Sequence, residues 1–234
     1  GRSGTHQLRG PVRNAAGGFV FKRYAIFYTP EGEFAEWGAR WLGWNSRTGA
    51  VVRHPDIAGL DVPALTDTPR KYGLHGTLKA PFALAADTNQ LRIEQVAAEF
   101  AQNHSGFEAG PLALCYKNGF VALRPSLDLP VLQEFADLVV RAFDHLRAPL
   151  TAEDLIRRRK TRLSSRQDQQ LMTWGYPFVF DDFQFHLTLT GRVNNQMAAQ
   201  VIEALEPQIG PLLPARFVIN AITLMGEDAD GMFH

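Results

Sequence analysis

Cysteine, surplus charge and long apolar runs are all scarce in this 234-residue chain. Cys115 is the single cysteine, which excludes a disulfide framework and any paired-cysteine zinc or redox site. Lys and Arg together number 24, as do Asp and Glu, so the chain lacks the positive excess of a nucleic-acid coat or a membrane-surface protein. No segment approaches the roughly 18 apolar residues of a spanning helix. The sequence therefore predicts a soluble cytoplasmic protein that does not act at a membrane.

The common nucleotide and metal motifs are also missing. The chain has no P-loop and no GxGxxG fingerprint, which argues against NTP hydrolysis and dinucleotide binding. It has no HxH, HExxH or Asp-rich cation loop, and His54, His104 and His145 have no partner motif. We therefore expect no cofactor and no metal site, and we interpret these three histidines as structural or surface groups.

The N-terminal residues differ in composition from the rest of the chain. Residues 1–18 contain five glycines and three arginines but no acidic residue. We interpret them as a flexible tail or a cloning remnant, followed by a single bilobal domain over residues 19–234.

From residue 23 onward, strand and helix signals follow each other. Phe34, Trp37, Trp41 and Trp44 recur at steps of three and four, which predicts one face of an amphipathic helix. Residues 45–71 show no clear period, which indicates a lid or specificity loop, disorder or a short helix. The other predicted elements are strands at 23–29, 74–82, 183–191 and 217–225, helices at 89–103, 132–146, after Thr151 and at 195–209, and a hairpin with Lys117-Asn118-Gly119 between residues 112–116 and 120–123.

A comparison of the chain with itself reveals a repeated motif. Leu74-His75-Gly76-Thr77-Leu78 and Phe185-His186-Leu187-Thr188-Leu189 share the pattern apolar-His-any-Thr-Leu, each on a predicted strand that a helix follows. With 7 histidines and 13 threonines, chance alone gives fewer than one His-x-Thr triplet per chain. Two copies in matching contexts therefore favour a functional origin over two structural histidines.

Strand geometry predicts which side chains of each motif act together. Residues i and i+2 of a strand point to the same face, so His75 and Thr77 project together, as do His186 and Thr188. The same count adds Lys79 to the first pair and Thr190 to the second. One neutral and one protonated imidazole form a base and an acid near neutral pH, and threonine hydroxyls donate to phosphate oxygens. The pattern suits the opening of a phosphodiester without a metal.

Other residues are weaker candidates. Arg192 follows Thr190 by two residues, and Tyr24 and Tyr72 carry rings that stack on a base or sugar, although packing is the more common role of such rings. The six positive residues between Arg157 and Arg166 include no acid between them; such a run gathers phosphorylated substrate or RNA, but it is more often a solvated helix face.

Both motifs and their flanks resemble a known superfamily. The two His-x-Thr strands are similar to those of the 2H phosphoesterases. Arg70–Phe82 (RKYGLHGTLKAPF), Trp174-Gly175-Tyr176-Pro177 and the run from Phe185 to Arg192 resemble the branch associated with phosphonate-metabolism operons. The resemblance covers the chain from about Tyr24 to its end. It implies a duplicated bilobal α+β fold, with antiparallel sheets lining a central cleft and helices outside. It also implies that His75 and His186 are the catalytic pair and that Thr77 and Thr188 bind phosphate.

The sequence leads to one favoured function and two alternatives. The favoured function is a metal-independent cyclic phosphodiesterase that opens a small cyclic phosphate, such as a phosphoribosyl cyclic phosphate of phosphonate breakdown. The alternatives are an enzyme acting on RNA 2′,3′-cyclic phosphate ends and a non-catalytic nucleotide- or RNA-binding module. A small phosphorylated substrate is the expected partner, RNA is not favoured, and no obligate protein partner is evident. The sequence does not assign which histidine is the base.

Overall fold

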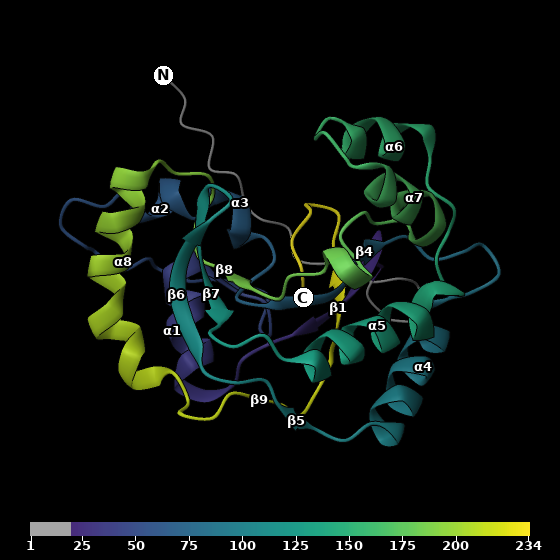
Figure 1. Ribbon diagram of the computed structural model, residues 1–234, viewed down its shortest axis with the longest axis horizontal. Helices are drawn as coiled ribbons and strands as arrows, with labels where there is room; N and C mark the ends of the chain where they lie inside the picture. The colour runs from purple at the N-terminus through teal and green to yellow at the C-terminus, as the bar shows by residue number, and fades with distance from the viewer. Residues whose placement is uncertain (1–19) are drawn as a thin grey trace.

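The structure is a computed structural model that describes residues 20–234, so the predicted tail at residues 1–18 lies outside the described residues (Figure 1). The strands are β1 (Arg23–Tyr28), β2 (Trp44–Asn45), β3 (Ala50–Val51), β4 (Gly76–Phe82), β5 (Phe107–Glu108), β6 (Leu112–Lys117), β7 (Phe120–Pro125), β8 (Leu187–Thr188), β9 (Val218–Ile219) and β10 (Thr223–Glu227). The helices are α1 (Gly32–Leu42), α2 (Val62–Leu65), α3 (Asp67–Arg70), α4 (Gln90–Asn103), α5 (Pro130–Asp144), α6 (Ala152–Arg159), α7 (Ser165–Trp174) and α8 (Asn195–Ile209).

One antiparallel sheet organises the molecule. Its six strands lie in the order β10-β1-β4-β8-β7-β6, and two small two-stranded sheets pair β2 with β3 and β5 with β9. The predicted α+β class is confirmed. The structure does not confirm a duplication into two lobes, because the strands that carry the two motifs are neighbours in one continuous sheet.

Several elements form where local signals place them. α1 buries Phe34, Trp37 and Trp41 and ends at Gly43, whose φ of 79° permits the left-handed helix cap. Trp44, predicted to share this helical face, lies beyond that end in β2. The Asn118-Gly119 turn has φ values of 59° and 86°, which both central residues of a type I′ hairpin require. The capping box of Thr151 opens α6 as predicted.

Two predicted strands and one helix differ from the prediction, and the structure decides between the alternatives for residues 45–71. The strand expected at 183–191 is only the two-residue β8, preceded by a 3₁₀ turn at Phe180–Asp182, and the strand expected at 217–225 divides into β9 and β10. Residues 45–71 form β2, β3, α2 and α3, so the short-helix alternative holds for this stretch. The helix α7 was not predicted, although its capping box of Ser164 and Gln167 is visible in the sequence.

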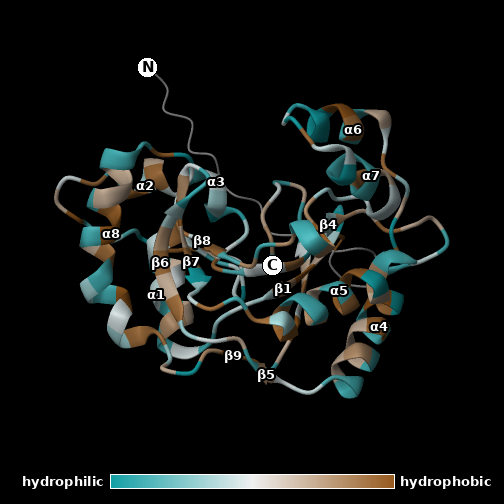
Figure 2. Cartoon of the chain, in the orientation of Figure 1, coloured by the Kyte–Doolittle hydropathy of each residue, from teal (hydrophilic) through white to brown (hydrophobic). Residues whose placement is uncertain are grey.

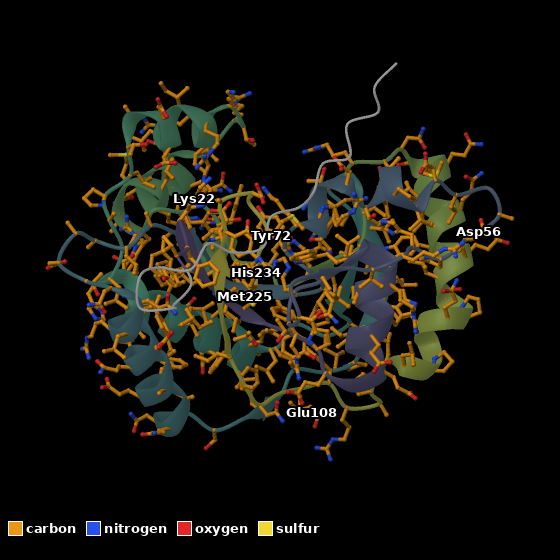
Figure 3. All side chains as sticks on the ribbon, turned by 180° about the vertical axis from the view of Figure 1, so that it is seen from behind. Lys22, Asp56, Tyr72, Glu108, Met225 and His234 are labelled. Carbon is orange, nitrogen blue, oxygen red and sulfur yellow. The ribbon has the colours of Figure 1, made fainter. Side chains whose placement is uncertain are left out.

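The two faces of the sheet have different surroundings. α5 packs against β4 and α8 packs against β6 and β7, and these helices share the main core with Leu123 and Leu187. Figure 2 shows hydrophobic residues concentrated along β6 and β7 and hydrophilic ones on the outer turns of α8. The opposite face carries a smaller cluster of Ala25, Phe27, Met225 and Phe233 against Tyr72. Figure 3 labels Met225 and Tyr72 of this group. None of the helices over residues 20–234 is both long and apolar enough to cross a membrane.

Candidate functional site

The two His-x-Thr motifs meet at the centre of the sheet. The antiparallel pairing of β4 with β8 aligns the motifs at their middle residues. Continued by one residue on each side, this register sets His75 opposite Thr188 and Thr77 opposite His186. Directly opposed residues of an antiparallel pair point to the same face, with Cβ atoms about 4.5–5.5 Å apart. The fold therefore brings both imidazoles and both hydroxyls together on one face.

Both histidines make the same backbone hydrogen bond. The Nδ1–H of His75 donates to the carbonyl of Gly73 at 3.0 Å, and the Nδ1–H of His186 donates to the carbonyl of Gln184 at 2.7 Å. In each case the acceptor lies two residues before the ring. A neutral imidazole held in this way keeps its lone pair on Nε2. In His75 this Nε2 lies 3.1 Å from the hydroxyl oxygen of Thr77, which donates to it.

Burial keeps both rings neutral in the free protein. Desolvation lowers the pKa of His75 to about 4; the carbonyl of Gly73 opposes this shift, and the nearby His186 adds to it. Desolvation also lowers the pKa of His186, against the effect of its carbonyl partner, and the charge of Arg124 acts in the same direction as burial. The ring of His75 stacks on Phe27 with centroids 4.0 Å apart, which fixes its plane. The site thus presents two basic nitrogens that an anionic ligand helps to protonate.

A cavity of about 220 Å³ opens beside these groups. It is smaller than the roughly 300–1,000 Å³ of pockets for drug-sized ligands, which favours a small substrate. Its wall contains one histidine and both threonines of the motifs, two further arginines, and the tyrosine predicted as a secondary contact. The lining residues are Arg23, Phe27, Thr68, Pro69, Tyr72, His75, Thr77, Ala80, Pro81, Arg158, Tyr176 and Thr188.

Lys79 was predicted to share the face of Thr77, and the structure places it on the opposite one. Thr77 pairs with Phe27 on β1, whereas Lys79, two residues on, pairs with the adjacent Ile26, because the register shifts at this point. This bulge reverses the alternation of side chains. The ammonium of Lys79 is buried against α5, 3.3 Å from both the Val140 carbonyl and a carboxylate oxygen of Asp144. Burial lowers its pKa to about 8.

The other secondary candidates are also outside the cavity, with one exception. Thr190 is buried, and its hydroxyl oxygen accepts a hydrogen bond from the Val121 backbone N–H at 3.0 Å. Tyr24 is buried in the main core and donates its hydroxyl hydrogen to Gln90. Arg192 is exposed beside the Asn118-Gly119 turn. Tyr72 is the exception, with its ring centroid 5.4 Å from that of His75.

Arg124 on β7 lies beside His186, although it does not line the cavity, and the sequence analysis did not identify it. The pairing of β7 with β8, continued by one residue, sets Arg124 opposite His186. Its guanidinium lies over the Phe120 ring at 5.4 Å, and the same ring lies 5.4 Å from that of His186. The buried Nε and Nη2 atoms of Arg124 have no hydrogen-bond partner within the described chain. Its signal in the sequence is one arginine in an otherwise apolar strand, on the same alternation as Phe120 and Ala122.

The basic run divides into paired and unpaired arginines. Arg157 pairs with Asp154 at 2.6 Å, Arg159 with Asp168 at 2.7 Å, and Arg166 with Asp182 at 2.8 Å, all on exposed surface. Arg158 instead lines the cavity. For these three paired residues the solvated-face interpretation holds, whereas Arg158 reaches the site.

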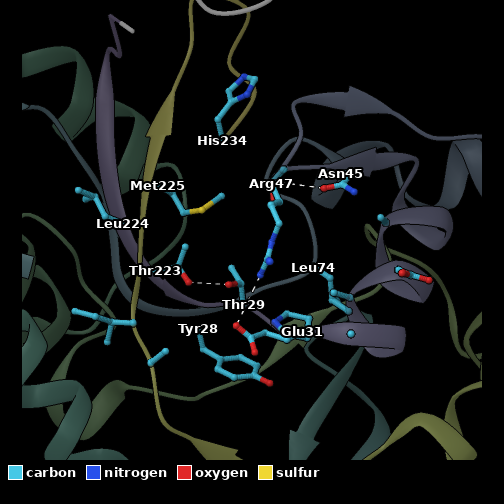
Figure 4. A pocket seen from close by; sticks show the side chains of 18 of the residues that line it. Tyr28, Thr29, Glu31, Asn45, Arg47, Leu74, Thr223, Leu224, Met225 and His234 are labelled. Carbon is cyan, nitrogen blue, oxygen red and sulfur yellow. Dashed lines mark hydrogen bonds and ion pairs between the residues drawn. The ribbon is translucent and has the colours of Figure 1, made fainter. Parts of the chain in front are cut away.

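A larger cavity of about 940 Å³ lies elsewhere, beside the open edge of β10 (Figure 4). Its wall includes neither motif histidine. Four of its polar side chains are paired with each other, since the hydroxyls of Thr29 and Thr223 are 2.7 Å apart and Arg47 lies 3.8 Å from Glu31. Volume alone does not make it the reactive site.

The fold and site define an α+β protein with two His-x-Thr strands side by side and several arginines around them. Over residues 20–234, no cluster of three or more His, Cys, Asp or Glu side chains is arranged to hold a metal ion. Residues 77–234 match a family described as "Protein of unknown function (DUF1045)". The chain belongs to this family.

Two curated relatives resemble most of the chain. One, from Janthinobacterium sp. (strain Marseille), is 32% identical over 218 residues, which are 89% of this chain and 48% of the relative. Another, from Laribacter hongkongensis (strain HLHK9), is 33% identical over 177 residues, 74% of this chain and 40% of the relative. Both are named "Ribose 1,5-bisphosphate phosphokinase PhnN". The chain thus spans about half the length of these relatives or less.

Proposed function

We propose that this protein is a metal-independent phosphodiesterase of the 2H type that opens a small cyclic phosphate. The observation that supports this most strongly is the pairing of β4 with β8, which brings both motifs to one face with both imidazoles in the same tautomer. Binding alone does not require two titrating groups in this arrangement. The small cavity beside them favours a sugar phosphate over a long RNA strand.

The two histidines divide the proton transfers between them. Nε2 of one ring takes a proton from water as the water oxygen attacks phosphorus. The bond from phosphorus to a sugar oxygen breaks, and the second ring, protonated at Nε2, gives its proton to that oxygen. The low pKa of His75 favours His75 as the base and His186 as the acid. The negative charge of the bound phosphate promotes protonation of the acid.

Thr77, Thr188 and Arg124 stabilise the phosphate during this step. The two hydroxyls donate to its non-bridging oxygens, and Arg124 neutralises the developing charge in the role that the sequence suggested for Lys79. The unpartnered N–H groups of Arg124, in register with His186, support this assignment. A buried donor without a partner costs free energy, and an anionic ligand would supply the missing acceptor.

The relatives' name bears on the substrate. It refers to a doubly phosphorylated ribose, which agrees with the resemblance to the branch found with phosphonate metabolism and with a phosphoribosyl cyclic phosphate as substrate. We infer that the phosphokinase chemistry in that name belongs to the half of those relatives that this chain does not match, since this sequence carries no P-loop.

Ring opening on a panel of cyclic phosphates, in the presence of EDTA, tests the proposal. The panel contains nucleoside 2′,3′-cyclic phosphates and phosphoribosyl cyclic phosphate, and the variants are His75→Ala and His186→Ala. Each variant is expected to lose about 10²–10⁴-fold in rate, the usual contribution of a positioned acid or base. His145→Ala, at an exposed position on the surface, is the control. Turnover that EDTA abolishes, or that survives both substitutions, contradicts the mechanism.

The binding-module alternative rested on the basic run. Three of its arginines are paired with carboxylates, which weakens the case for an RNA-binding face. Retained ligand binding in the double histidine variant, with no turnover by the wild type, would favour that alternative.

A further inference from the structure

The candidate cavity has further polar side chains beyond those of the two motifs. Arg23, Arg158, Tyr72 and Tyr176 share its wall with the motif residues. Phe27 pairs with Thr77, and Arg23 lies four residues earlier on the same strand and face. At about 3.3 Å per residue, the backbone of Arg23 lies about 13 Å along β1 from that of Phe27, which is opposite Thr77. The cavity therefore extends along β1 from the reacting groups to an arginine pair.

Arg158 differs from its neighbours in the basic run. The residues on either side of it, Arg157 and Arg159, pair with carboxylates, whereas Arg158 has no carboxylate partner among the described residues. Its guanidinium lies 4.9 Å from the ring centroid of Tyr176. Burial lowers the pKa of Arg158, and the charge of Arg23 acts in the same direction. A cation held in a partly desolvated cavity near a second cation is favourable mainly when an anion binds between them.

Arg23 is fixed in place from behind. Its Nε and Nη2 donate to the two carboxylate oxygens of Glu227 at 2.5 Å and 2.7 Å. This pair sets the plane of the guanidinium and neutralises one charge. Two arginines against one carboxylate leave one positive charge in this part of the cavity, whose wall also contains Tyr176.

The helix that carries Arg158 is suited to cover this end of the cavity. α6 has no buried residue, and α6 and α7 stand together above the end of β4, apart from the helices that pack on the sheet (Figure 1). Arg158 on α6 and Tyr176, which follows the end of α7, both contribute to the cavity wall.

We propose that Arg158 and Arg23, with Tyr176, form a second phosphate subsite that binds a phosphate monoester at the far end of the substrate. This inference rests on the proposed function and narrows its substrate class to cyclic phosphates that carry a second phosphate. Arginine forks and tyrosine hydroxyls are donors that suit the three free oxygens of a monoester. Arg158 then acts as a specificity residue and takes no part in the proton transfers.

The test compares a ribose cyclic phosphate with and without a 5-phosphate. The wild type is expected to prefer the 5-phosphorylated compound. In Arg158→Gln the ratio of kcat/KM between the two compounds is expected to fall about 10–100-fold, mostly through KM, because one charge-assisted contact is lost. Arg157→Gln, one residue away on the same helix and outside the cavity wall, is the matched control and is expected to keep the ratio within about twofold. An unchanged ratio in Arg158→Gln overturns the subsite.

Binding of ribose 5-phosphate, measured by calorimetry, separates the subsite from the catalytic proposal. Binding that weakens about 10–100-fold in Arg158→Gln and not in Arg157→Gln supports the subsite even if no cyclic phosphate is opened. Turnover of both cyclic compounds without binding of ribose 5-phosphate overturns the subsite and leaves the proposed function standing.

Discussion

At the scale of single residues, the protonation of the two histidines decides how activity depends on pH. The proposed mechanism needs one neutral and one protonated ring. Because burial lowers both pKa values, the pH range in which only one ring is protonated moves below the ordinary value of 6.5. We expect kcat/KM to follow a bell with its optimum on the acid side of 6.5 and an acid limb near pH 4 from His75. The pH profile of kcat is expected to lie at higher pH than that of kcat/KM, since bound phosphate raises the pKa values of both histidines.

Steady-state kinetics from about pH 3 to 9 on the best substrate of the panel measures this. His145→Gln, which changes an exposed histidine outside the cavity, serves as the control and is expected to keep both profiles. A flat kcat/KM profile, or an optimum above pH 7 when chemistry limits the rate, would be inconsistent with two buried imidazoles.

The sequence predicts some of these residues better than others. His75, Thr77 and Thr188 line the cavity, whereas His186 does not. Their triplets are short, and strand alternation is regular over two residues. The predicted position of Lys79 on the face of Thr77 is wrong, because a bulge between β1 and β4 reverses the alternation of side chains. No local signal in the sequence marks that bulge. Arg124 and Arg23 depend on strand register, which a single sequence does not reveal.

At the scale of elements, Gly76 controls how closely β4 and β8 approach. A methyl group at this position would overlap the ring of Phe185, which is 6% exposed and packed in the core. Gly76→Ala is therefore expected to separate the two motif strands, at a cost of about 1–3 kcal/mol in unfolding free energy for overpacking. A displacement of about 1 Å between catalytic groups costs on the order of 100-fold in rate.

Urea unfolding and kcat/KM measured on the same samples check both effects. Gly210→Ala is the control, since a Cβ there meets nothing within 4 Å and the backbone is helical. Adding Phe185→Leu to Gly76→Ala is expected to recover part of both losses by relieving the overlap. Wild-type stability and activity in Gly76→Ala would show that this contact does not set the strand spacing.

The sequence predicts the helices of this fold better than its short strands. Helices α4 and α8 lie where their apolar periods place them, because each buries one continuous stripe. β8 is far shorter than its apolar run, since the chain leaves a 3₁₀ turn at Phe180–Asp182 and residues 183–186 form no strand ladder. Apolar character predicts burial there, but it does not predict pairing.

At the scale of the whole molecule, the candidate site lies across the least paired part of the sheet. β6 and β7 pair over six residues, whereas β4 and β8 share one pair and β7 and β8 share two. A phosphate held by Thr77 from β4 and Thr188 from β8 would join the two sides of this junction. Ligand binding should therefore stabilise the centre of the sheet more than its edge.

We expect inorganic phosphate, as a product-like anion, to raise the melting temperature and to slow hydrogen exchange at Leu187 and Thr188 more than at the β6–β7 amides. At a phosphate concentration of about 100 times the Kd, binding adds about 2.7 kcal/mol to the free energy of unfolding. For a protein of this size, this raises the melting temperature by roughly 5–10 °C. Thr77→Val and Thr188→Val should each reduce this shift, because they remove a hydroxyl and keep the side-chain shape. Thr48→Val, at an exposed turn far from both motifs in sequence, should keep it. Equal protection of all strands, or a full shift in both motif variants, would mean that the anion binds elsewhere and does not bridge β4 and β8.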